Sequence, residues 1–220
     1  MTGDGFLAIW SDVTPEIETD YLHWLTREHT QERVGIPGFL SVRAFRALHV
    51  STRRYFILYE LRDPAVVGSS DYLARLNAPT PWSQRIMPQL QNFARGGGRK
   101  VAEFGTGCGG YIAVLRSDAP ISAELQARAA ELATMDRLAA VRMYETDLAQ
   151  TSIRTNEKGM RAGDGSFASL VLVESLDEAA LSDACAALGQ PPPTTTQSVA
   201  VPTYVSVFAL DRRALPPATS

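Results

Sequence analysis

Apolar and polar residues alternate along the chain in a way that predicts the same order of elements twice. Residues 5–104 read as strand, helix, strand, strand, helix, strand, and residues 109–212 read in that order again. Apolar runs and period-two alternation mark the strands, and apolar positions three and four apart mark the helices. The pattern therefore predicts two βαββαβ units of the ferredoxin-like kind, each with four antiparallel strands and two helices on one face.

The first unit opens with an apolar strand and an amphipathic helix. The helix is expected over 15–34, because Tyr21, Trp24 and Leu25 follow steps of three and four and share one face. Gly35 can end it in the left-handed conformation. The other expected elements are strands at 5–11, 39–49, 54–61 and 100–104, a helix at 67–77, a short helical segment within 83–93, and a flexible glycine loop at 95–98.

The second unit has a plainer sequence. Its glycine-rich start at 105–110 is interpreted as a hinge, because a phosphate-binding loop needs a helix after it and here a strand follows. The expected elements are strands at 111–116, 138–149, 167–174 and 204–210, helices at 120–134 and 177–188, a mobile polar connection at 151–166, an extended proline linker at 191–196, and a disordered tail at 213–220.

The strands carry apolar and aromatic side chains on both faces, so the sheet face opposite the helices must also be covered. Two such sheets that pack face to face cover each other's apolar faces and form a closed barrel. We expect an α+β fold in which residues 1–104 and 109–212 build this barrel within one chain, as a pseudo-dimer. The alternative is two separate sandwiches that pair with other copies, and a further homodimer stays open in either case.

Composition narrows the functional classes. The chain has 220 residues, 45% hydrophobic, with a formal net charge of -3. It has no basic stripe, so nucleic acid is not an expected partner, and no apolar run approaches the length of a membrane span. Without a visible signal peptide the expected location is cytoplasmic. Cys108 and Cys185 lack nearby histidines, so neither a metal site nor a disulfide framework is expected.

The chemistry-bearing residues gather in the first unit, where a polar and aromatic stretch spans 23–29. His29 is the leading catalytic candidate, because an imidazole titrates near neutrality and can pass a proton to or from a small substrate. An arginine on the following strand could bind a carboxylate or an enolate oxygen; Arg43 is the catalytic candidate and Arg46 a ligand-binding one, and the two lie on opposite strand faces. The remaining candidates for ligand contact are Trp24, Tyr55 and Tyr59 as walls, and Trp82 and Met87 as a roof. The structural alternative is that His29 stabilises a helix end and the tryptophans are core residues.

The first unit resembles the EthD-like branch of the dimeric α+β barrel superfamily over residues 5–104. The resemblance lies in Glu28 and His29 late in the first helix, in Arg33, and in the Ile-Pro-Gly-Phe sequence at 36–39 that leads into the strand bearing Arg43. The segments 55–61 and 80–88 are similar as well. The second unit lacks the acid-histidine pair and the Pro-Gly-Phe sequence. The resemblance implies a cavity between the helical layer and the sheet.

Three functions remain open on these grounds. The first is a cofactor-free enzyme, of the monooxygenase or isomerase kind, that moves a proton on a small aromatic or ketone-like metabolite. The second is a non-enzymatic protein that binds a small molecule or takes part in a stress response. The third is an oligomeric assembly module. The first two require His29 to face an enclosed pocket of a few hundred Å³.

Overall fold

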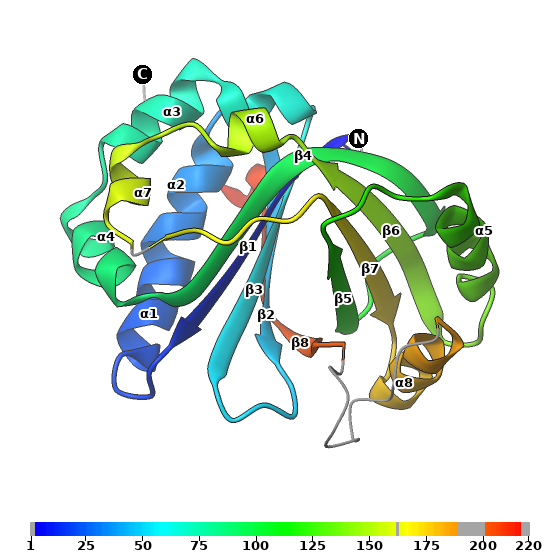
Figure 1. The fold of residues 1–220 in the computed structure, drawn as a ribbon. Coiled ribbons are helices and arrows are strands. Elements are labelled where there is room, and N and C mark those ends of the chain that lie inside the picture. The colour runs from blue at the N-terminus through cyan, green and yellow to red at the C-terminus, as the bar shows by residue number, and fades with distance from the viewer. Residues whose placement is uncertain (1–2, 162, 189–200, 217–220) are drawn as a thin grey trace.

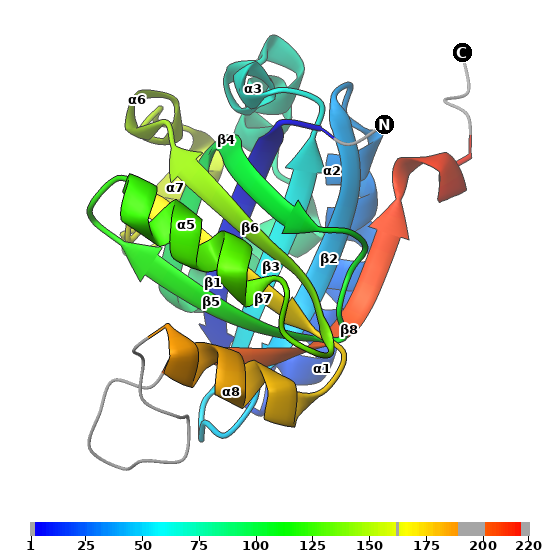
Figure 2. The same cartoon turned by 90° about the vertical axis from the view of Figure 1, so that its right-hand side faces the viewer.

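The computed structural model describes residues 3–161, 163–188 and 201–216. Its eight strands form a closed barrel in the order β1-β3-β2-β8-β5-β7-β6-β4, and all neighbouring strands are antiparallel. Helices lie outside the barrel on two sides, with α1 to α4 on one and α5 and α8 on the other (Figure 1, Figure 2). The predicted α+β class and the barrel closed within one chain are confirmed. No described helix has the length and apolar character needed to cross a bilayer.

The strands of each half follow one another in the predicted order, and the second half has two short helices, α6 and α7, that were not predicted. The first half contains β1 Gly5–Val13, α1 Glu18–Trp24, a π-helical turn Leu25–His29, α2 Thr30–Gly35, β2 Phe39–Ala47, β3 Arg53–Leu61, a 3-10 turn Pro64–Gly68, α3 Ser70–Asn77, α4 Pro81–Ile86, a 3-10 turn Met87–Gln89 and β4 Gln91–Gly105. The second half contains β5 Tyr111–Ser117, α5 Ala123–Leu132, β6 Leu138–Thr146, α6 Leu148–Thr151, α7 Asn156–Gly159, β7 Ser169–Ser175, α8 Glu178–Ala187, β8 Thr203–Asp211 and a 3-10 turn Arg212–Ala214.

The barrel interior is a packed core. Side chains of one parity on every strand point inward and form a cluster that includes Phe6, Trp10, Phe56, Phe167 and Tyr204. Side chains of the other parity pack outward against the helices in two further clusters, one on each side of the barrel, and the ends of β4 and β8 extend into the cluster of the opposite half. The apolar residues on both strand faces therefore have covered positions, as the sequence required.

The glycine run at 95–98 is not a flexible loop, and that expectation was wrong. It lies inside β4, a strand of 15 residues that pairs with β1 on one side and β6 on the other and so closes the barrel. A Cβ atom on Gly98 would lie 2.1 Å from the carbonyl oxygen of Glu145, and one on Gly96 would lie 2.4 Å from the Phe167 ring. The glycines are there because neighbouring backbone and a core ring approach more closely than any side chain allows.

The connection 151–166 was expected to be a mobile polar loop, and this was also wrong. It contains α7 and crosses from the second half to the helical side of the first, beside α3 and α4 (Figure 1). Asn156 bonds to Asn77 through both its backbone and its side chain, and Gly165 pairs with the backbone at Phe93 and Arg95. The linker expected at 191–196 lies outside the described residues. In the expected tail, residues up to Ala214 form a 3-10 turn.

Replacing Gly98 with alanine is expected to lower the free energy of unfolding by about 1–3 kcal/mol, because backbone atoms of β6 would have to move away from the new methyl group. Urea unfolding measures the change. Gly110→Ala is the matched control, since nothing lies within 4 Å of a Cβ atom at that position. Equal stabilities of the two variants would show that β4 has room for side chains here.

Candidate functional site

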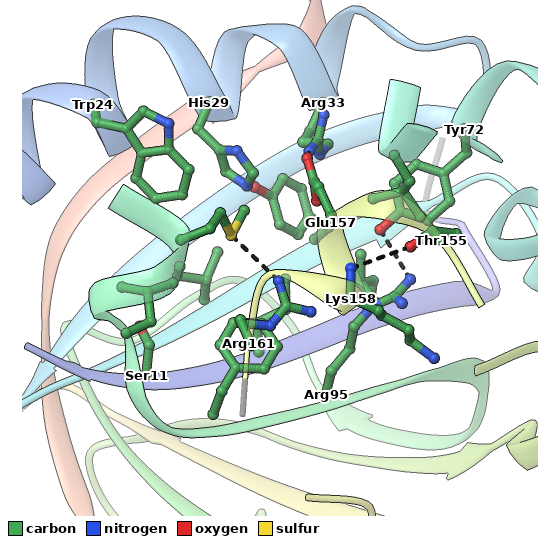
Figure 3. A pocket seen from close by; sticks show the side chains of 18 of the residues that line it. Ser11, Trp24, His29, Arg33, Tyr72, Arg95, Thr155, Glu157, Lys158 and Arg161 are labelled. Carbon is green, nitrogen blue, oxygen red and sulfur yellow. Dashed lines mark hydrogen bonds and ion pairs between the residues drawn. The ribbon is translucent and has the colours of Figure 1, made fainter. Parts of the chain in front are cut away.

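A cavity lies between the helical layer of the first half and the outer face of its sheet. The sheet contributes Leu7 and Ile9 from β1 and Ile57 and Tyr59 from β3. The helix α1–α2 with its π-helical turn covers one side, α3 another, and the segment with α7 closes it (Figure 3). This is the location that the resemblance implied.

The π-helical turn places His29 in this cavity. Residues five apart in a regular α-helix point about 140° away from each other. Here the N–H of Thr30 bonds to the carbonyl of Leu25, five residues back, so the turn is one residue wider. As a result, the rings of Trp24 and His29 are in contact, tilted by 33° with their centroids 4.2 Å apart, and the indole N–H of Trp24 donates to Ser83 Oγ at 3.1 Å.

His29 is buried, at 5% exposure, and its Nδ1 atom has no hydrogen-bond partner among the described residues. Burial, together with the charges of Arg33 and Arg161, lowers its pKa well below the ordinary value. The ring is therefore neutral at pH 7, with one nitrogen that carries a proton and one that can accept a hydrogen bond. Glu28 does not orient it, because the Glu28 carboxylate accepts from Thr80 Oγ1 at 2.6 Å instead.

Four cationic side chains and one carboxylate line the cavity. Arg33, itself 2% exposed, pairs with Glu157, and Arg161 pairs with Asp164 at 3.0 Å. The remaining two cations are Arg95 and Lys158, and neither forms an ion pair within the described part of the chain. The wall of the cavity thus carries an excess of positive charge.

Three buried polar atoms that belong to the lining have no hydrogen-bond partner in the described structure: His29 Nδ1, the Tyr59 hydroxyl, and Arg33 Nη1, which lies 3.9 Å from a carboxylate oxygen of Glu32. Unpaired buried polar groups are costly, and when several converge on one cavity they mark a place where a polar ligand or water is bound. The volume enclosed is about 30 Å³, enough for about two water molecules. This is far below the few hundred Å³ expected, so a larger ligand enters only if lining side chains or the α7 segment move.

The structure brings together half of the predicted site residues. Trp24, His29, Tyr59 and Met87 all line the cavity. The other four predicted residues do not. Tyr55 donates to Glu18 at 2.6 Å and Trp82 to Asp20 at 3.0 Å, both away from the cavity, and Arg46 is exposed.

Arg43, the fourth of these, belongs to a different cluster at one mouth of the barrel. Its guanidinium holds the fully buried Glu174 carboxylate with two bonds of 2.7 Å. Arg142 binds the same carboxylate, and the Gly109 N–H donates to it at 2.9 Å. This network joins β2 of one half to β6, β7 and the junction of the other, so the structure gives Arg43 a role in holding the barrel together.

Sequence reasoning missed Arg95, Glu157, Lys158 and Arg161. Arg95 fell in the supposed glycine loop, and the others fell in the supposed mobile connection. Only the unusual length and charge of the connection could have drawn attention to it, and neither shows which half it covers. Among the described residues, no three His, Cys, Asp or Glu side chains are grouped to hold a metal ion.

No protein-family model and no curated protein matches the chain. Solved structures do. An "anthrone oxidase-like protein" matches with a TM-score of 0.59 at 12% identity over 100% of this chain and 98% of the other. A "putative monooxygenase" from Fusobacterium nucleatum subsp. nucleatum matches with 0.55 at 11% identity over 96% of each chain. A "putative chlorite dismutase" matches with 0.52 at 13% identity over 94% and 96%. At such identities the likeness shows the fold alone: this chain has the dimeric α+β barrel fold.

The buried neutral histidine predicts a pH dependence of stability. The unfolded chain takes up a proton on this imidazole below about pH 6.5, and the folded chain does so only at lower pH. Stability therefore falls as the pH falls below 6.5, with a contribution from this group of up to about 1.4 kcal/mol per pH unit. His29→Gln should show a shallower loss of unfolding free energy between pH 6.5 and 5.0 than the wild type. His23→Gln, on the same helix and only half-buried, serves as the control; if His29→Gln keeps the wild-type slope, the histidine is not buried neutral.

Proposed function

We propose that this chain is a cofactor-free enzyme, of the monooxygenase or isomerase kind, that transfers a proton on a small aromatic or ketone-like metabolite. One observation carries the proposal: a neutral, buried His29 presents an unpartnered nitrogen to a cavity walled by aromatic and cationic side chains. The names of two solved structures with this fold, anthrone oxidase-like and monooxygenase, agree with such chemistry.

The proposed step is removal of a proton from an acidic C–H bond or hydroxyl of the substrate by His29 Nδ1. The electron pair stays on the substrate as an enolate or phenolate. Arg33 and Arg161 already lower the proton affinity of the imidazole, and they stabilise a negative charge that develops on the substrate beside it. In an isomerase the proton returns to another atom of the substrate. In a monooxygenase the carbanion is oxidised by dioxygen, a second substrate: one oxygen atom forms a bond to the carbon and the other leaves as water with the two hydrogens that the substrate gives up.

We further propose that the two halves arose by duplication of an EthD-like unit, over 1–104 and 109–212. Their strand orders support this, because each half follows the order fourth-first-third-second: β4-β1-β3-β2 and β8-β5-β7-β6. The first unit supplies His29 and most of the cavity wall, and the second unit closes the cavity with the α7 segment. A cytoplasmic location and assembly into a homodimer belong to the same proposal.

The small enclosed volume favours one alternative, the oligomeric assembly module, which needs no pocket that admits a ligand. In that case His29 and its neighbours are structural, and the cavity holds only water. The two functions differ in whether the imidazole takes part in a reaction.

His29→Gln separates the two. With anthrones and cyclic 1,3-diketones as trial substrates, the wild type should exchange substrate C–H for deuterium or consume dioxygen. The variant should be slower by about 10²–10⁴-fold, because a general base is lost while the side chain keeps a similar size. His23→Gln should keep the wild-type rate. Two results would contradict the proposed enzymatic function: an exchange rate in His29→Gln equal to that of the wild type, or wild-type rates no higher than those in buffer alone with every one of these compounds.

A further inference from the structure

Two cations of the cavity stand without a counter-charge. Arg95 lies on β4 and is 6% exposed. Its guanidinium donates to the Tyr72 hydroxyl at 3.0 Å and lies 5.6 Å from the centre of that ring. Both are contacts with a neutral group, and no carboxylate pairs with Arg95 within the described residues.

Lys158, on α7, is the second of these cations. Its ammonium donates to the Thr151 carbonyl, also a neutral group. Its pKa is lowered, first by desolvation and then by the charge of Arg95, while the nearby Asp164 carboxylate acts in the opposite direction. The two cations thus come from different halves of the chain and repel each other where the α7 segment meets β4. Arg95 is buried without a carboxylate partner, which is unfavourable, so the arrangement gains free energy when an anion lies beside Arg95 and the half-buried Lys158.

The nearby carboxylates form their ion pairs with other cations, and the charge of Asp164 offsets that of Lys158 only in part. Glu157 is committed to Arg33, and Asp164 to Arg161 through two bonds of 3.0 Å. His29 contributes no charge at neutral pH. The need for a counter-charge is therefore specific to the end of the cavity where Arg95 and Lys158 lie.

The other end of the cavity is apolar. Figure 3 places Trp24 at one end and Arg95, Lys158 and Tyr72 at the other, with Arg161 between them. Trp24, Tyr21 and Leu90 are buried and line the same space, and the guanidinium of Arg161 lies 3.8 Å from the centre of the Phe93 ring. A ligand with an aromatic body and a negative end matches both ends at once.

From this we infer that the cavity takes an organic anion, with its carboxylate or comparable acidic group between Arg95 and Lys158 and its apolar body toward Trp24. The inference rests on the proposed function in placing the ligand in the same cavity, and it adds the class of substrate. His29 then lies along the body of the ligand, away from the anionic group, where it can reach an acidic C–H or hydroxyl. Lys158 and Arg161 sit on the segment that closes the cavity, so this segment or the lining side chains move to admit the aromatic body of the ligand.

The test compares acids with their neutral amides: 1-naphthoate with 1-naphthamide, and benzoate with benzamide, by calorimetry and thermal shift at 50 mM and 300 mM salt. The wild type should bind each acid at least tenfold more tightly than its amide, and the preference should shrink at high salt. Arg95→Gln and Lys158→Gln should each weaken acid binding about tenfold and leave amide binding within threefold. Arg99→Gln is the control, because Arg99 lies on the same strand, exposed and paired with Glu145.

Amides that bind as well as the acids, or acids that do not bind the wild type at millimolar concentration, would overturn the inference. The inference also fails if Arg99→Gln weakens acid binding as much as Arg95→Gln does. The wild-type comparison stands even if a variant fails to fold. The two proposals fail separately. If the wild type and His29→Gln both prefer acids to amides but neither turns over a substrate, only the proposed catalysis is contradicted. If the wild type turns over a substrate but shows no preference for acids, only this inference is contradicted.

Discussion

The buried ion pair between Arg33 and Glu157 is the contact on which the site depends. The two residues lie 124 positions apart and come from α2 and α7. A buried charge left without its partner costs about 3–5 kcal/mol, so the pair holds the α7 segment of the second half against the helices of the first. That placement closes the cavity over His29 and brings in Lys158 and Arg161. The pair thus makes one site out of both halves of the chain.

The filled barrel explains why the site lies outside it. Aromatic side chains from both halves occupy the interior, so a ligand can be enclosed only between a sheet and its helices or near a barrel mouth. In the second half, small aliphatic residues of α5 and α8, among them Ala129, Leu181 and Ala184, pack directly onto the sheet. In the first half, larger aromatic and charged residues keep the helices and the sheet apart, and the cavity lies between them.

The sequence was informative where local pattern determines structure. Alternation located the strands, apolar residues on both strand faces required the closed barrel, and the polar stretch containing Trp24 and His29 marked one wall of the cavity. Sequence reasoning failed where long-range contacts override local preference. The glycine run is a strand because Glu145 and Phe167 approach it, a contact that only the closed barrel creates. The sequence did not show that Arg43 lies outside the cavity, because its partner, Glu174, lies on a strand of the other half. The segment around Glu157 reads as an ordinary polar loop until its buried partner is known.

Amide hydrogen exchange in the wild type and in Glu157→Gln tests the role of this contact most directly. If the ion pair holds the cavity closed, exchange of residues 152–161 rises at least tenfold in the variant, while exchange in strands β5 and β7 is unchanged. Two results would contradict the account. A uniform rise across the chain would mean that the pair supports the fold as a whole, and no rise in this segment would mean that the pair does not hold the segment in place.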